Sequence, residues 1–130
     1  MTTQATSKAH KSNVNWFEIS VSDIAKATRL YEATLDTTLK QDLFEGVPNA
    51  FFFGPDKSIG ALVADPKRPA RGGGSTVSYL AVPNVAHALA RAVEAGAKVV
   101  QPETAIGPQG HIGLFADFDG NVIGLHTPVK

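Results

Sequence analysis

Apolar side chains recur at every second position between residues 15 and 21, and this period of two predicts a β-strand. One face of the strand consists of Phe17, Ile19 and Val21, and the other of Trp16, Glu18 and Ser20. Asp23 then supplies a helix N-cap, and apolar residues follow at helical spacing as far as Thr34. Three short apolar segments predict strands over 38–44, 50–53 and 58–63, separated by turn signals at 46–49 and 54–56.

The second half of the chain repeats this order of elements after a linker. Residues 66–74 (PKRPARGGG) have the composition of a flexible connector. Further elements are then predicted: a strand over 76–82, a helix from Asn84 to Gly96, strands over 97–100, 112–116 and 121–126, and a hairpin turn at Asp119-Gly120. The halves superpose at an offset of about 61 residues, which pairs the helix caps Asp23 and Asn84. We therefore expect an α+β fold of two tandem βαβββ modules, 14–65 and 75–127, preceded by a disordered tail over 1–13.

The composition narrows the possible partners. The 130 residues carry 12 basic and 12 acidic side chains, so the chain lacks the positive excess that nucleic acids or anionic membranes attract. No stretch approaches the roughly 18 apolar residues of a membrane-spanning helix, and the opening residues lack the apolar segment of a secretory signal. Cysteine is absent, which removes disulfides, thiolate metal sites and cysteine nucleophiles. We therefore expect a cytoplasmic protein that binds neither nucleic acid nor membrane.

Three stretches of the chain are informative together: WFEISVSDIAKATRLY, YLAVPNVAHALARAVEAGAKVV and ADFDGNVIGLHT. In combination they resemble the vicinal oxygen chelate superfamily, which includes glyoxalases, bleomycin and fosfomycin resistance proteins and extradiol dioxygenases. The last stretch is similar to the family's Asp-Pro-x-Gly-Asn signature, with Phe118 in place of the proline, and Leu30-Tyr31 stands where Phe-Tyr is usual. The resemblance covers residues 14–127 and extends to the branch of predicted enzymes related to lactoylglutathione lyase. It implies one domain whose curved sheets enclose a cavity, and a homodimer.

The resemblance also implies four positions for metal ligands. These positions fall on Trp16, Ala61, Val77 and Gly124. None of these side chains supplies the imidazole or carboxylate donors that zinc, nickel or iron requires. We therefore expect no metal and no other cofactor. A relocated metal site built from Glu18, His126 and His111 stays open as an alternative.

Strand alternation predicts an apolar and aromatic cavity lining, the usual composition of a small-molecule pocket. The expected lining residues are Trp16, Glu18, Ser20, Ala61, Val77, Tyr79, Gly124 and His126. A carboxylate on an apolar concave face tends to have a raised pKa, so Glu18 is a candidate acid or base, with His126 as its proton-exchanging partner. Plainer interpretations compete: Glu18 binds a backbone amide or an arginine near the pocket mouth, and His126 is solvated. His10 lies in the expected tail, and His87 and His111 are expected at the surface.

Functions of different classes are compatible with these features. In the first, the protein binds a small organic molecule in a metal-free, aromatic-lined cavity. In the second, it is a metal-independent enzyme of lyase or isomerase type that uses Glu18 and His126 to transfer protons. A metal-dependent enzyme with relocated ligands is a third. Replacing Glu18 by Gln separates the first two, because retained affinity with abolished turnover is expected only of an enzyme.

Overall fold

The computed structural model describes residues 13–129, so the expected tail over 1–13, with His10, lies outside the described residues except at Asn13. Two four-stranded sheets and two helices make up the fold. The first half supplies β1 (Phe17–Ser20), α2 (Ile24–Leu35), β2 (Lys40–Phe44), β3 (Val47–Phe53) and β4 (Ser58–Val63). The second half supplies β5 (Tyr79–Ala81), α3 (Val85–Glu94), β6 (Lys98–Ala105), the short 3₁₀ helix η1 (Gly107–Gln109), β7 (His111–Ala116) and β8 (Val122–Thr127). The expected α+β fold with two βαβββ modules is confirmed.

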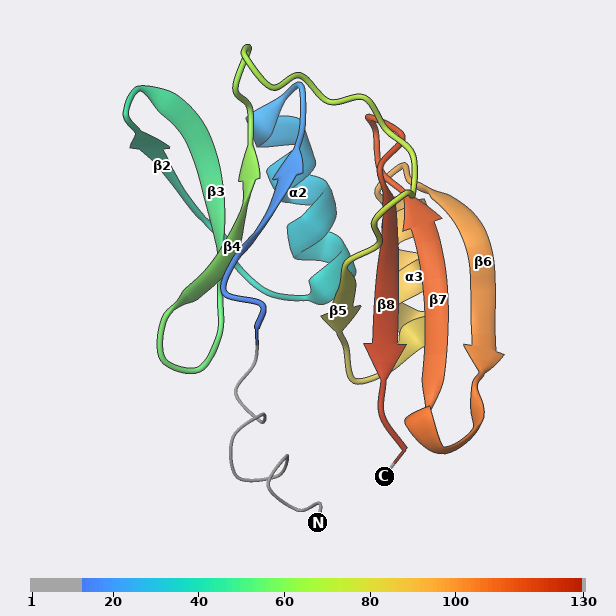
Figure 1. Cartoon of the computed structure of the whole chain (residues 1–130). Helices are drawn as coiled ribbons and strands as arrows, with labels where there is room; N and C mark the ends of the chain where they lie inside the picture. Colours follow the sequence, from blue (N-terminus) through green and yellow to red (C-terminus); the bar gives the residue numbers. More distant parts are fainter. Residues whose placement is uncertain (1–12, 130) are drawn as a thin grey trace.

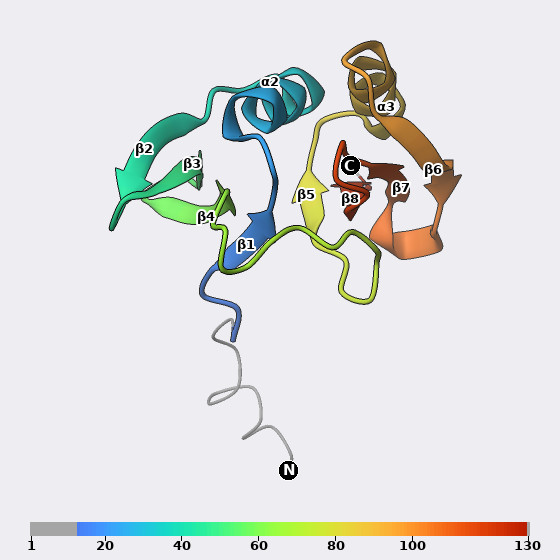
Figure 2. The same ribbon diagram turned by 90° about the horizontal axis from the view of Figure 1, so that it is seen from above.

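The two sheets lie side by side with both helices on one side. Sheet one has the strand order β1-β4-β3-β2 and sheet two the order β5-β8-β7-β6. In each sheet the first strand is parallel to its neighbour and the other pairs are antiparallel. Strands β1 and β5 are the inner edge strands of the two sheets (Figure 1), and Figure 2 shows α2 and α3 beside each other on one side of the molecule. Helix α2 packs on β3 and β4, and α3 packs on β6, β7 and β8. The side away from the helices is called the open face below.

The implied cavity is not enclosed within one chain. In the described part of the chain the two sheets remain separate four-stranded units and do not close into a barrel. Each sheet therefore has its own open face. The connection from β4 to β5 crosses the seam between the sheets on this side (Figure 2).

One buried core joins the two modules. Ile19 lies in this core and Leu80 packs against it, which confirms the apolar faces expected for the two leading strands. Tyr31 of α2 is fully buried, and its ring contacts Phe52 of β3 and Phe115 of β7, each with centroids 5.9 Å apart. The aromatic contacts of a single side chain thus connect sheet one to sheet two.

A buried carboxylate makes a second connection between the modules. The Tyr31 hydroxyl donates to Asp117 Oδ2 at 2.7 Å, and burial raises the pKa of Tyr31 well above its usual value, with the charge of Asp117 adding to the shift. The backbone amides of Asp119 and Asn121 donate to Asp117 Oδ1, so this residue also closes the β7–β8 turn. Asn121 Nδ2 donates both to Asp117 Oδ2 and to the carbonyl of Ser20 in β1. The Asp-x-x-Gly-Asn motif (residues 117–121) therefore connects the second module to α2 and β1 of the first.

The helix ends form as the sequence predicts. Asp23 accepts a hydrogen bond from the Lys26 amide at 3.0 Å, and Asn84 accepts one from the His87 amide at 2.9 Å. These bonds satisfy amides that have no partner within the helix. At the other end of α2, Arg91 of α3 donates to two last-turn carbonyls, those of Ala33 and Thr34, each at 2.9 Å. Arg91 thus ties the two helices together.

Three predicted boundaries are wrong. The turn expected at 46–49 lies at Glu45-Gly46, where both residues have positive φ, and β3 already includes Val47 and Pro48. Such a pair gives the hairpin twist that antiparallel strands favour, although glutamate rarely adopts this conformation. The strand expected over 76–82 is only β5 (Tyr79–Ala81), and the one expected over 97–100 extends to Ala105 with irregular pairing.

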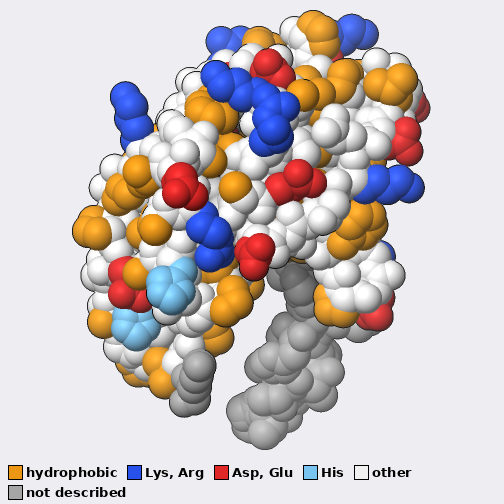
Figure 3. All heavy atoms as spheres, turned by 180° about the vertical axis from the view of Figure 1, so that it is seen from behind, with side chains coloured by type: hydrophobic (Ala, Val, Ile, Leu, Met, Phe, Trp, Pro, Cys, Tyr) orange, Lys and Arg blue, Asp and Glu red, His pale blue; other side chains and the backbone are white. Residues whose placement is uncertain are grey.

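The helix-covered side shows charges of both signs interspersed with hydrophobic side chains (Figure 3). This mixture agrees with the net charge of zero. In residues 13–129, neither helix has the length and apolar character needed to cross a membrane.

Candidate functional site

The open face of sheet one carries a pocket of about 280 Å³. Glu18 stands at its edge on β1, directly opposite Ala61 of β4 in the strand register. The pocket lies between the open face and the first residues of the β4–β5 connection. Its lining residues, called the sheet-one pocket below, are Glu18, Phe44, Glu45, Val47, Asn49, Val63, Asp65, Lys67 and Arg68.

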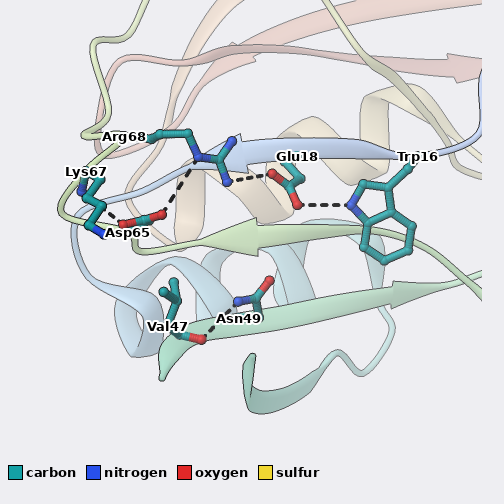
Figure 4. Close-up of polar contacts among 7 residues, drawn as sticks. All are labelled: Trp16, Glu18, Val47, Asn49, Asp65, Lys67 and Arg68. Carbon is teal, nitrogen blue, oxygen red and sulfur yellow. Dashed lines mark hydrogen bonds and ion pairs between the residues drawn. The ribbon is translucent and has the colours of Figure 1, made fainter. Parts of the chain in front are cut away.

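Glu18 is held by two hydrogen bonds. Its Oε2 accepts from the Trp16 indole Nε1 at 3.1 Å, and its Oε1 accepts from Arg68 Nη2 at 2.7 Å (Figure 4). Asp65 Oδ2 lies 3.8 Å from Arg68 Nε, so the guanidinium stands between two carboxylates. The hydrogen bond and charge of Glu18 raise the pKa of Arg68. This arrangement corresponds to the interpretation in which Glu18 binds an arginine near the pocket mouth.

The remaining surface around Glu18 combines aromatic rings with one carboxamide. Trp16 is 39% exposed, and its ring lies 6.2 Å from that of Phe51 at 56°. Asn49 is buried, and its Nδ2 donates to the carbonyl of Val47 at 3.0 Å. This leaves its carboxamide oxygen directed away from Val47, toward the side of Glu18 and Arg68 (Figure 4). The sheet-one pocket therefore offers acceptors and a cation beside flat apolar surface.

The other expected cavity residues lie on sheet two. Tyr79 pairs with Gly124, and its ring lies so close to this glycine that a Cβ there would come within 2.4 Å of the Tyr79 Cδ1 atom. His126 pairs with Ala81, and its Nε2 lies 2.6 Å from the carbonyl oxygen of Gln109. Val77 is half-buried and precedes β5.

The structure therefore divides the expected lining in two. Glu18, Ser20 and Ala61 lie on the open-face side of sheet one, with Trp16 just before β1, whereas Tyr79, Gly124 and His126 share the open face of sheet two. Ala61 is fully buried, so the expectation that it lines the cavity is wrong. Glu18 and Ser20 also border a second pocket of about 310 Å³ at the seam, together with Thr76, Ser78 and Asn121. Glu18 and His126 are thus on separate sheets, and each has a different partner.

The residues present do not fit the metal site that the resemblance implies. Trp16, Ala61, Val77 and Gly124 contribute no imidazole or carboxylate donor, and Tyr79 covers Gly124. Over residues 13–129, no three His, Cys, Asp or Glu side chains are grouped so that they could hold a metal ion. The relocated set of Glu18, His111 and His126 forms no such group either.

Sequence reasoning missed the residues that the connection contributes to this site. Residues 66–74 were predicted to be only a flexible linker, yet Lys67 and Arg68 line the sheet-one pocket. The available signal was the run of basic residues in PKRPARGGG, which lies some 50 positions from Glu18. Composition alone does not indicate which strand such a segment contacts.

Comparison with known proteins identifies the family of this chain. Residues 13–125 match the family model described as the Glyoxalase/Bleomycin resistance protein/Dioxygenase superfamily. Among proteins with curated descriptions, none matches this sequence.

Solved structures with the same fold span nearly the whole chain. TnmS3, an antibiotic binding protein from Streptomyces sp. CB03234, is 30% identical with a TM-score of 0.61 over 92% of this chain and 98% of that one. A glyoxalase/bleomycin resistance protein from Albidiferax ferrireducens T118 is 16% identical, with a TM-score of 0.73 over 91% of this chain and 100% of that one. The fosfomycin resistance protein FosX from Listeria monocytogenes is also 16% identical, with a TM-score of 0.66 over 92% and 95%.

Proposed function

Because the chain belongs to the glyoxalase/bleomycin resistance protein/dioxygenase superfamily, we propose that it binds a small organic molecule in the sheet-one pocket. The observation that carries the proposal is the placement of Glu18, Asn49 and Arg68 around a hollow of about 280 Å³ beside the Trp16 ring. A few convergent polar groups next to aromatic surface are typical of small-molecule sites. The antibiotic binding protein TnmS3, at 30% identity, supports a binding role.

The catalytic alternative is a metal-independent lyase or isomerase reaction with Glu18 as the acid or base. It draws support from the position of Glu18 at the edges of two pockets. The histidine expected to exchange a proton with Glu18 is His126, which lies on sheet two and contacts the carbonyl of Gln109. Proton exchange between Glu18 and His126 within one chain therefore requires a rearrangement. Binding is therefore the function that the geometry favours.

We also propose that two copies of the chain associate through their open faces. Each sheet presents exposed aromatic side chains there, with Trp16 on sheet one and Tyr79, 50% exposed, on sheet two. Facing sheet one of one copy with sheet two of the other would cover these rings and bring the two halves of the expected lining together. Light scattering at micromolar concentration should give a dimer mass, and a monomer mass would overturn this association.

Intrinsic fluorescence tests the binding proposal directly. Trp16 is the only tryptophan, and its indole donates to Glu18, so its emission reports on changes around Glu18, which borders the sheet-one pocket and the pocket at the seam. A panel of small aromatic and heterocyclic compounds should include ligands that change this emission saturably, with the same affinity measured by calorimetry. Glu18→Gln should weaken those ligands, whereas Glu103→Gln on the exposed part of β6 should not.

Two results would contradict the proposal. The first is binding measured by calorimetry that leaves Trp16 emission and the Glu18→Gln affinity unchanged, because the ligand would then occupy another site. The second is turnover by the wild-type protein that Glu18→Gln abolishes while affinity is retained, which would favour the catalytic alternative.

A further inference from the structure

The Arg68–Glu18 pair suggests what kind of ligand the pocket accepts. Resting on the proposed function, we propose that the ligand carries a cationic group, an amine, amidine or guanidine. We propose further that the guanidinium of Arg68 occupies the place of this group until the ligand displaces it. Arg68 then acts as an internal competitor that the β4–β5 connection supplies.

Two carboxylates converge on the position that Arg68 fills. Glu18 approaches it at 2.7 Å and Asp65 at 3.8 Å. The side chains of Glu18 and Asp65 are 33% and 19% exposed, whereas that of Arg68 is 55% exposed. The acidic groups are thus the more deeply seated part of the arrangement, and the cation covers them from outside.

The charge balance of the pocket favours the same ligand. Three acidic side chains line it, those of Glu18, Glu45 and Asp65, against the two basic ones of Lys67 and Arg68. Once Arg68 has moved away, three acids face a single lysine. Charge complementarity therefore favours an incoming cation and disfavours an anion.

The contacts of Arg68 are of the kind that a ligand can replace. Ion pairs between partly exposed side chains contribute little, because water screens them and holding two long side chains costs entropy. The connection is anchored at its ends, where Arg68 N donates to the carbonyl of Asp65 and Gly73 pairs with Asn121. Displacing the guanidinium leaves the Trp16–Glu18 hydrogen bond in place, so the carboxylate stays oriented.

Three probes of one shape and different charge test the proposal. Benzamidine is a planar cation, benzamide is its neutral counterpart and benzoate is the anion. Each is titrated into the full chain, with Trp16 emission and calorimetry as the readouts. We expect benzamidine to bind more tightly than benzamide, and benzoate to bind least.

Variants then separate competition from simple contact. Arg68→Ala should increase the affinity for benzamidine about two- to fivefold, the amount expected on removing an exposed ion pair. The affinity for benzamide should stay unchanged. Arg29→Ala removes the same charge from the exposed surface of α2, away from both pockets that Glu18 borders, and is the matched control; it should change neither affinity. Glu18→Gln should abolish the difference between benzamidine and benzamide. Thermal melting of each variant confirms that it is folded.

Each other outcome overturns the competitor role. If Arg68→Ala weakens benzamidine or leaves it unchanged, Arg68 is not displaced by the cation. If benzoate binds best and depends on Arg68, the pocket is an anion site. In both cases a probe still binds at Trp16, so the proposed function stands. If none of the three probes binds to wild type or to Arg68→Ala, the cationic class is wrong, and the broader compound panel decides the proposed function separately.

Discussion

Replacing Tyr31 by Phe removes the hydroxyl that links α2 to Asp117 and leaves the ring in place. Because the Tyr31 side chain is fully buried, water cannot replace the lost hydroxyl as a donor to Asp117. Because a phenylalanine ring keeps the contacts with Phe52 and Phe115, the substitution leaves no large cavity. A buried hydrogen bond to a charged group contributes about 1.5–3 kcal/mol. Asp117 keeps its bonds from Asn121 and two backbone amides, which places the expected loss of unfolding free energy near 2 kcal/mol.

The loss can be measured by urea unfolding followed by circular dichroism, and by thermal melting. With an unfolding entropy of about 0.25 kcal/mol/K for a chain of this size, a loss near 2 kcal/mol corresponds to about 8 °C in Tm. A double-mutant cycle with Asp117→Asn should return a coupling energy of about 1 kcal/mol or more. A loss below about 0.5 kcal/mol for Tyr31→Phe would refute the reasoning, because the bond would then contribute no more than a solvated one.

The pH dependence gives an independent check with a definite sign. The folded-state pKa of Tyr31 is raised well above 10.0 by burial and by Asp117, whereas in the unfolded chain it has its ordinary value. At high pH the unfolded state therefore loses its proton first, and the stabilisation that is complete below pH 10 declines as the pH rises through the folded pKa. The stability difference between wild type and Tyr31→Phe should narrow above pH 10 and stay constant between pH 7 and pH 9.

Three further substitutions test other contacts. Arg91→Ala removes two hydrogen bonds to the last turn of α2 and should lower the unfolding free energy measured in urea by about 1–2 kcal/mol. Arg91→Lys should restore only part of this stability. An unchanged unfolding free energy in Arg91→Ala would mean that water caps these carbonyls equally well. Asp23→Ala should cost about 1 kcal/mol as a lost N-cap, and a matching loss in Asp23→Asn would argue against capping as the cause. Gly124→Ala places a Cβ where the Tyr79 ring lies, so near-ultraviolet circular dichroism should show a displaced tyrosine, and an unchanged spectrum would contradict this packing.

Local features were predicted well because their causes are local. Asp23 and Asn84 cap helices through amides three residues away, and the alternation around Ile19 assigns the buried face of β1 correctly. The turn predicted at 46–49 was misplaced, because a glutamate with φ of 51° is unusual and Glu45 carries no turn signal.

The site was predicted only in part because its remaining contacts join distant segments. Strand alternation indicates which face of a strand is open, and Glu18 and Tyr79 do lie on open faces. It does not indicate whether two such faces point into one cavity, and here they belong to separate sheets. Arg68 reaches Glu18 across 50 positions, and its direction depends on the path of the connection rather than on its composition.

The hydrogen bonds that residues 117–121 make to the first module also affect how the protein folds. Tyr31 and Asp117 lie 86 positions apart in the sequence, and Asn121 and Ser20 lie 101 positions apart. The parallel pairings of β1 with β4 and of β5 with β8 add further long-range contacts. Chains rich in such contacts fold slowly, because long loops must close before the contacts stabilise them. Either module alone would lack a partner for Tyr31 or for Asp117. Although the two repeats are built alike, we therefore expect them to unfold together in a single calorimetric transition rather than as two independent halves.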